Sequence, residues 1–210
     1  MNRSYLALPA LSLCLLAACS RDKGPEATGA KDPTVTETAP VEQHLKPVPM
    51  QYEEPIVGGA RMAAGKDILS NLGNSSDHTI LMAAIKAAGL TEILQGSGPF
   101  TLFAPTDAAF KRLPGGYEQL MQPENQERLL AVLTYHLVPG RLDADVLAGR
   151  VMAGNGSAQL VTVQGGTLKA SVGNGAAILV DAKGTVARLT TPNVLQSNGV
   201  VQVIDTVLMP

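Results

Sequence analysis

The chain has 210 residues, of which 45% are hydrophobic, and its formal net charge is −2. A charge this close to zero, with no basic stripe along the sequence, gives no indication of nucleic-acid binding. Both cysteines, Cys14 and Cys19, lie near the start, so the rest of the chain has no thiol for a disulfide, a metal site or a nucleophile. Beyond a leader and a linker, the remaining sequence amounts to about one domain, which is long enough to bury a core.

The first 18 residues are typical of an export signal. A positive charge precedes an almost continuous apolar run over residues 5–18, which is too short for a good membrane-spanning helix. The end of this run, Leu16–Cys19 (LAAC), resembles a bacterial lipobox, in which the cysteine is lipidated and becomes the new N-terminus. We expect Cys19 to carry lipid, and Ser20 after it favours the outer membrane in an organism with two membranes. The alternative is an ordinary cleaved signal with an incidental cysteine.

Residues 19–51 are predicted to form a disordered tether. The segment is rich in Pro, Thr and Ala, and it has almost no large apolar residue before Val35. Such a sequence cannot bury enough surface to offset the entropy lost on ordering. The tether would hold a folded domain, expected at residues 52–210, away from a lipid surface.

The first half of the folded region is predicted to be mostly helical. Apolar residues at helical spacing predict a helix over Ser75–Leu90, capped by Ser75 or Ser76, with His78 as a capping or surface residue. A longer helix is predicted to begin at Pro123 and to run to about Tyr135. Shorter helices are predicted at residues 66–72, 91–94 and 117–121.

A short apolar run over Pro99–Pro105 is predicted to be a buried strand, because turn residues bracket it. The polar pair Thr106-Asp107 is predicted to cap the helical turn that comes next. We expect Phe100, Phe103 and Phe110 to share one core, of which they would be the anchor because only 3% of the chain is aromatic.

From Val151 onward the sequence changes to short β-rich runs. Turns containing glycine, such as Gly165-Gly166 and Lys183-Gly184, separate them. The strands are expected at residues 151–152, 160–163, 167–172, 177–180, 186–189 and 200–208. Helices followed by antiparallel strands, with no alternation of strand and helix, predict an α+β domain.

Three segments together carry a family resemblance. They are PFTLFAPTDAAFKRLP at residues 99–114, LTYHLVPG at residues 133–140 and NGVVQVIDTVLMP at residues 198–210. Their order and spacing resemble the signature segments of the fasciclin (FAS1) family. The resemblance runs from about Ile56 to the end, and it implies a single fasciclin domain, a β-sandwich wedge with a layer of helices. The third segment has Gln202 where the family usually has His.

The signature segments supply the candidate site residues, as an interaction motif or a structural one: Thr106, Asp107, Tyr135, His136, Asn198 and Asp205. In the family, the Tyr135-His136 segment is associated with adhesion. The residue types also fit a structural interpretation, in which a buried His136 bonds to the Thr106-Asp107 turn and fixes the long helix against the central strand. The sequence leaves both interpretations open.

The sequence indicates no catalytic, cofactor or metal site. Gly-x-Ser-x-Gly is absent, the acidic pairs Glu53-Glu54 and Asp143/Asp145 look solvated or like a helix start, and three scattered His residues do not form a ligand set. The run Gly154-Asn155-Gly156 is predicted to be a hairpin turn and not a phosphate loop. We therefore expect a protein that is not an enzyme and binds no cofactor.

These features predict an adhesion or interaction module, lipid-anchored in the cell envelope. It would be exported, attached to the outer membrane on its periplasmic face or at the cell surface, and would bind an extracellular or envelope protein or glycan, without nucleic acid. The alternative is an envelope carrier of a small ligand, for instance a hydrophobic or pigment molecule, held in an apolar cleft between the helices and the sheet.

Overall fold

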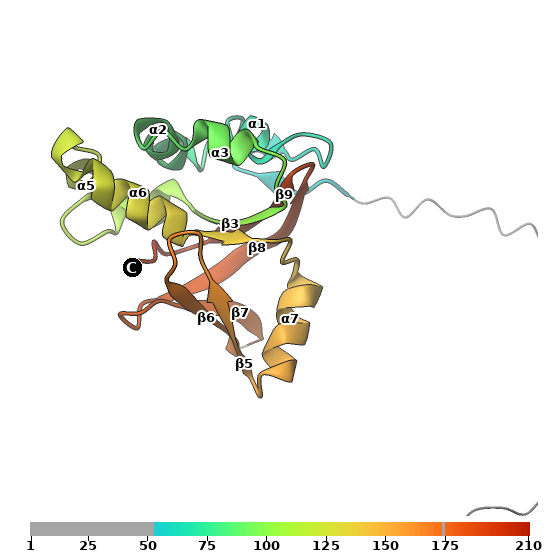
Figure 1. The fold of residues 1–210 in the computed structure, drawn as a ribbon. Coiled ribbons are helices and arrows are strands. Elements are labelled where there is room, and N and C mark those ends of the chain that lie inside the picture. The colour runs from blue at the N-terminus through green and yellow to red at the C-terminus, as the bar shows by residue number, and fades with distance from the viewer. Residues whose placement is uncertain (1–52, 174) are drawn as a thin grey trace, which may run out of the picture. The chain divides into compact units, whose positions relative to one another are not determined.

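The computed structural model describes residues 53–173 and 175–210. The predicted leader and the whole of the predicted tether, with Cys19, lie outside these residues, as does Tyr52 at the start of the predicted domain. In the described part, most helices come first in the chain and lie over one side of a sheet whose later strands continue below them (Figure 1). The architecture is α+β, a sheet wedge with a helical layer, as the sequence predicts.

The described chain begins with a small hairpin and three short helices. Gly58 and Gly59, both with positive φ, connect the two hairpin strands. The elements are β1 (Ile56–Val57), β2 (Ala60–Arg61), α1 (Ile68–Leu72), α2 (Thr79–Ala87) and α3 (Thr91–Gln95). Helix α2 begins four residues later than predicted, and neither predicted serine caps it.

The central strand is β3 (Phe100–Pro105), at the predicted position. It pairs antiparallel with β4 (Leu137–Pro139) and parallel with β9 (Gly199–Ile204). The parallel pair differs from the expected antiparallel arrangement. Between β3 and β4 lie α4 (Asp107–Lys111), α5 (Tyr117–Leu120), the 3-10 turn η1 (Pro123–Asn125) and α6 (Gln126–Tyr135).

The second half contains one helix and the remaining strands. These are α7 (Ala144–Ala153), β5 (Ser157–Val161), β6 (Thr167–Gly173), β7 (Ala176–Val180) and β8 (Val186–Gln196). The predicted strand at Val151-Met152 is wrong, because these residues form the last turn of α7. Asp143 begins that helix by accepting a hydrogen bond from the N–H of Val146 at 2.8 Å. The Gly154–Gly156 run therefore connects a helix to a strand and is not a hairpin.

Seven of the described strands form one sheet in the order β4-β3-β9-β8-β7-β6-β5. Along β8 the register with β9 shifts between Leu189 and Thr191 and again between Thr191 and Val194, so this strand is irregular where the two halves of the sheet meet. The N–H of Val163, just after β5, donates to the carbonyl of Leu137 in β4 at 2.7 Å. The far end of the sheet thus returns toward its beginning.

Two hydrophobic cores lie on the two faces of the β3–β9 pair. The first holds side chains from α1 to α6, including Phe110, with Phe100 packed at its border. The second holds Phe103, Tyr135 and side chains from α7 and β5 to β8. The prediction of one shared aromatic core is wrong, because residues 100 and 103 are an odd number of positions apart and a strand points them to opposite faces.

Candidate functional site

His136 is a buried acceptor that holds the C-terminal segment. The N–H of Leu208 donates to its Nε2 at 3.0 Å, so its Nδ1 carries the proton and donates to the carbonyl of Val132 at 2.7 Å. Burial lowers the pKa of His136 to about 4, although the Val132 carbonyl and the Asp181 carboxylate oppose this shift. The imidazole is therefore neutral at physiological pH.

Tyr135 is buried beside it and faces the second core. Its hydroxyl donates to the carbonyl of Thr167 at 2.9 Å and accepts from the N–H of Ala182 at 3.2 Å. Its ring lies so close to Gly166 that a Cβ there would be 2.7 Å from the ring edge. Tyr135 thus joins the end of α6 to β6 and to the β7–β8 loop, and its burial favours the structural interpretation of the Tyr135-His136 pair.

Asp181, which no sequence motif singled out, completes this network. Its Oδ1 accepts from the N–H groups of Lys183 at 2.9 Å and Thr185 at 2.8 Å, and its Oδ2 accepts from the N–H of Met209 at 3.0 Å. Burial alone would raise the pKa of Asp181, but the hydrogen bonds, that from Met209 foremost, hold it below its usual range. Two consecutive amides, of Leu208 and Met209, are therefore held by His136 and Asp181.

Asp107 and Thr106 do not bond to His136, which corrects the predicted contact. Asp107 Oδ1 accepts from the N–H of Ile80 at 2.9 Å and its Oδ2 accepts from the hydroxyl of Thr79, so Asp107 caps the start of α2 from a distant part of the chain. Thr106 caps α4 by accepting from the N–H of Ala109 at 3.3 Å. The signature turn after β3 thus orients two helices.

His78, predicted to be a capping or surface residue, immediately precedes α2 in the sequence and is fully buried. Its Nδ1 lies 2.9 Å from the hydroxyl of Ser75, and among the described residues its Nε2 has no hydrogen-bond partner. Burial lowers the pKa of His78, and the carboxylates of Asp77 and Asp107 oppose the shift. The sequence prediction missed this burial because the cap of α2 comes from Asp107, far along the chain. His78 therefore does not cap the helix, and its side chain is buried.

Asn198 ties the turn before β9 to two of the helices. Its Oδ1 accepts from the N–H of Ile68 at 3.1 Å, and its Nδ2 donates to the carbonyls of Leu94 at 2.7 Å and Gly96 at 3.2 Å. All three partners are backbone groups, which are costly to bury unpaired. Asn198 is therefore a structural residue that fixes α1 and α3 to the sheet.

Gln202, which stands where the family usually has His, is also used inside the fold. Its Nε2 donates to the carbonyl of Leu142 at 2.8 Å, and its Oε1 accepts from the N–H of Asn193 at 3.0 Å. The glutamine thereby joins β9 to the segment before α7 and to the irregular part of β8.

Asp205 lies at the edge of a cleft beside the C-terminal segment. Its Oδ1 accepts from the N–H of Arg188 at 2.8 Å and from the hydroxyl of Thr206 at 3.0 Å. Its backbone carbonyl accepts from Nη2 of Arg112 at 2.6 Å. This places the end of β9 against the helix that comes after β3.

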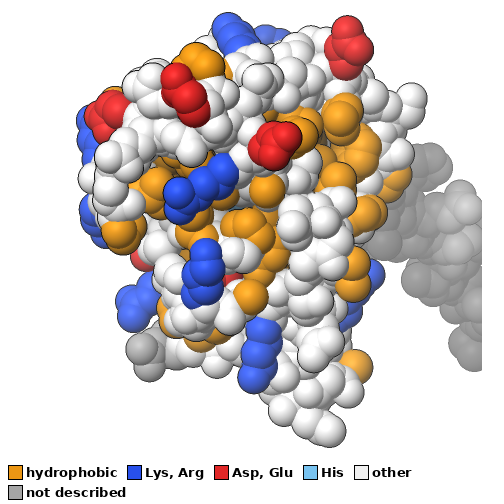
Figure 2. Space-filling model, turned by 60° about the vertical axis from the view of Figure 1, so that its left-hand side comes forward, with side chains coloured by type: hydrophobic (Ala, Val, Ile, Leu, Met, Phe, Trp, Pro, Cys, Tyr) orange, Lys and Arg blue, Asp and Glu red, His pale blue; other side chains and the backbone are white. Residues whose placement is uncertain are grey.

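The cleft itself has a volume of about 390 Å³. Among the described residues, its lining comes from α4 and the segment after it, the β7–β8 loop and the C-terminal segment: Ala109, Arg112, Leu113, Pro114, Lys183, Thr185, Asp205, Thr206, Val207 and Met209. Figure 2 shows hydrophobic side chains across the middle of one face, with Lys and Arg among and below them and Asp and Glu mostly toward the top. The cleft combines apolar side chains with polar and charged ones, which suits a ligand that is partly apolar.

The described residues offer little for other chemistry. Within residues 53–173 and 175–210, no group of three or more His, Cys, Asp or Glu side chains is placed to hold a metal ion. No helix in the described part combines the length and the apolar character that crossing a bilayer requires. The titratable side chains of the signature segments mostly bond to backbone groups.

Comparison with known proteins identifies the family that the signature segments resemble. A family model for the fasciclin domain matches residues 76–210. Protein sll1483 of Synechocystis sp. is 38% identical over 157 residues, which are 74% of this chain and 79% of that protein. The cell surface glycolipoprotein MPB83 of Mycobacterium bovis is 28% identical over 221 residues, 97% of this chain and 93% of that protein.

A solved structure shows the same fold. It is a FAS1 domain pair from the insect cell adhesion molecule fasciclin I, with a TM-score of 0.61 and 18% sequence identity. The match covers 69% of this chain and 51% of that one. Together with the family model and the relative from Synechocystis, this places the signature segments in their expected scaffold. The chain belongs to the fasciclin family.

Proposed function

We propose that this fasciclin domain is an exported, lipid-anchored interaction module that binds an extracellular or envelope protein or glycan without turnover. The observation that supports this most is the similarity to a cell surface glycolipoprotein over 97% of the chain, a span that reaches into the leader and tether. The Leu16–Cys19 segment supports the anchor. The lipid would be attached to Cys19 and hold the protein to the outer membrane.

The contact surface of such a module would not be the Tyr135-His136 pair. Both side chains are buried and bond to backbone groups. In this proposal the pair acts on binding only through the fold, so a variant that keeps the fold keeps the partner.

Replacement of Cys19 tests the anchor. Cys19→Ala should move the protein from the membrane fraction to the soluble fraction, because acyl chains contribute about 0.8 kcal/mol per buried methylene to membrane binding. The measurement is fractionation of cells followed by detection of the chain. Cys14→Ala is the matched control and should leave the protein with the membranes. A Cys19→Ala protein that still sediments with membranes would refute the lipobox interpretation.

A binding screen tests the interaction. The mature chain, residues 19–210 with Cys19→Ala, would be passed over immobilised glycans and envelope or host-matrix proteins, with native mass spectrometry of the same sample. We expect saturable binding to a macromolecular partner. Absence of saturable binding across these samples would count against the proposal.

A second candidate function, small-ligand binding in the envelope, is favoured by the cleft at the C-terminal segment. Its volume of about 390 Å³ falls in the range of about 300–1,000 Å³ that is common for small-molecule sites. The tether would then keep a binding protein close to the membrane.

A further inference from the structure

The floor of the cleft is apolar and is held in place by the signature motif. Leu113, Pro114, Val207 and Met209 line it. The segment that carries Val207 and Met209 is fixed by the two buried acceptors already described, His136 and Asp181. The floor is therefore formed before any ligand arrives, which reduces the entropy lost on binding.

The rim of the cleft is cationic. Arg112 and Lys183 lie on it, and Asp205 is the one acid among its described lining residues. Asp205 already accepts from the N–H of Arg188 and the hydroxyl of Thr206, which lessens its demand for a cation. The charge facing the cleft is thus positive, two cations against one engaged carboxylate.

Hydrogen bonds hold both cationic residues in place at the cleft. Arg112 donates to the carbonyls of Asp205 at 2.6 Å and Ala108 at 3.3 Å, which leaves other donors of its guanidinium for a ligand. Lys183 lies in the turn that Asp181 organises through the N–H groups of Lys183 and Thr185. Its ammonium group is not needed for that turn.

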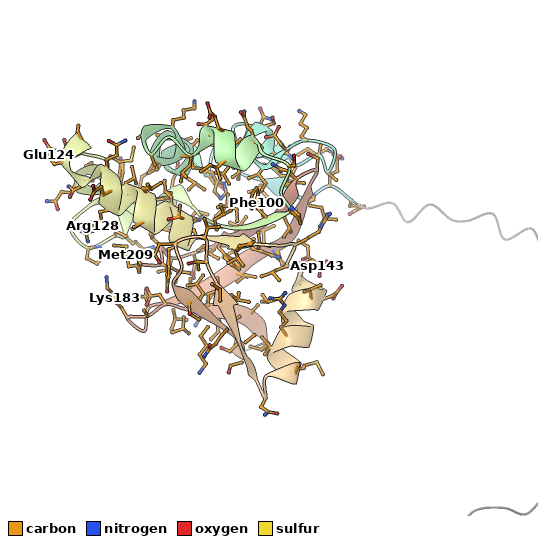
Figure 3. The ribbon with its side chains drawn as sticks, viewed as in Figure 1. Phe100, Glu124, Arg128, Asp143, Lys183 and Met209 are labelled. Carbon is orange, nitrogen blue, oxygen red and sulfur yellow. The ribbon has the colours of Figure 1, made fainter. Side chains whose placement is uncertain are left out.

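A second, mostly polar hollow lies next to the cleft, toward the start of α6. This hollow, of about 130 Å³, shares Leu113, Pro114 and Met209 with the cleft and adds the polar side chains of Gln119, Asn125 and Arg128. Figure 3 shows Arg128, Met209 and Lys183 one below another on the same side of the molecule. The polar hollow therefore bounds the apolar floor on this side and places a third cation, Arg128, near the cleft.

We propose that this cleft binds a small amphipathic anion, a carboxylate at the end of an acyl chain. The chain would lie over Leu113, Val207 and Met209, and the carboxylate would accept hydrogen bonds from Arg112 and Lys183. The charge of the rim selects an anion, and the apolar floor selects a tail. This inference rests on the second proposed function, small-ligand binding, and gives that function its ligand class.

The test compares decanoate with 1-decanol, which share a tail and differ in charge. Isothermal titration on the mature chain, residues 19–210 with Cys19→Ala, with decanoate below its micellar concentration, should give a decanoate affinity about tenfold higher than that for decanol, because a charge-assisted hydrogen bond is stronger than a neutral one. The preference should shrink as salt rises, since the cations are exposed.

Two variants and one control locate the binding. Lys183→Gln should weaken decanoate by about tenfold and leave decanol unchanged, because it removes the charge and not the floor. Met209→Gln keeps the N–H that bonds to Asp181 and should weaken both probes. Lys169→Gln, an exposed lysine of β6 that does not line the cleft, should change neither. Thermal melting of each variant verifies that it is folded.

The outcomes separate the inference from the function on which it rests. Equal binding of both probes, lowered by Met209→Gln but not by Lys183→Gln, overturns the anion and leaves small-ligand binding standing. Binding of neither probe overturns both. Self-association that Met209→Gln weakens would show that a second copy occupies the cleft, which also overturns the inference.

Discussion

Lowering the pH from 7 to 4 is expected to reduce the free energy of unfolding by about 3 kcal/mol through His136 alone. The pKa of this side chain is about 4 in the folded chain, against about 6.5 for an unperturbed histidine. Between these values the unfolded chain binds the extra proton, so folding loses stability as the pH falls. The contribution is fully present above about pH 6.5 and is lost near pH 4.

The physical reason lies in the two bonds of the ring. Protonated Nε2 would be a donor facing the N–H of Leu208, and the C-terminal segment would lose its acceptor. Urea unfolding followed by circular dichroism, at intervals from pH 7 to pH 4, measures the effect. The matched variant is His136→Gln, which can offer an oxygen to Leu208 and does not titrate in this range.

His136→Gln should therefore show a shallower pH dependence than the parent chain. A residual slope of the same sign is expected from His78, whose pKa burial also lowers. Identical slopes in the two proteins would contradict the assignment. His136→Ala at pH 7 should lose about 3 kcal/mol, because it leaves the N–H of Leu208 without its acceptor, removes the ring's hydrogen bond to the carbonyl of Val132 and opens a cavity. Unchanged melting with lost partner binding would instead make the Tyr135-His136 segment a contact surface.

Gly199→Ala is expected to destabilise the domain by about 3 kcal/mol, at the upper end of typical overpacking effects. Gly199 opposes Phe100 at the beginning of the parallel β3–β9 pair. A Cβ at this position would lie 2.0 Å from the carbonyl oxygen of Phe100 and 2.9 Å from its carbonyl carbon. Both are backbone atoms of the central strand, so one of the two strands must move.

Gly149→Ala is the matched control. Gly149 lies in the interior of α7, and a Cβ there would meet no atom within 4 Å. This substitution should stabilise the domain by about 0.5–1 kcal/mol, because alanine favours a helix over glycine. Chemical unfolding of both variants gives the comparison. A Gly199→Ala protein as stable as the parent would mean that the two strands are not so close.

Local sequence signals predicted much of the fold. The run over Pro99–Pro105, the Thr106 cap and the helix that ends near Tyr135 are all found where short-range patterns put them. The error at Val151-Met152 arose because a β-branched residue at a helix end resembles the start of a strand. The β3–β9 pairing joins strands about a hundred residues apart, and nothing local in either strand specifies such a partner.

In the candidate site, too, local signals identified residues but did not identify their long-range partners. The signature segments identified His136 and Asp107, but their partners lie far along the chain, at Leu208 and at Thr79 and Ile80. Asp181 had a usable local signal, since an aspartate two and four residues before the N–H groups that it accepts is typical of a turn. The cleft could not be read from the sequence, because three separate segments form it.

The position of β9 in the sheet determines when, during synthesis, the domain can fold. β9 is the last of the described strands in sequence, yet it lies between β3 and β8 and contributes to both cores. A chain still emerging from the ribosome lacks the middle of its sheet, and its earlier strands cannot close around it. The contacts that complete the domain are long-range, so folding waits until β9 has been synthesised. A chain that stays open until β9 is available is one that a secretion channel can still thread.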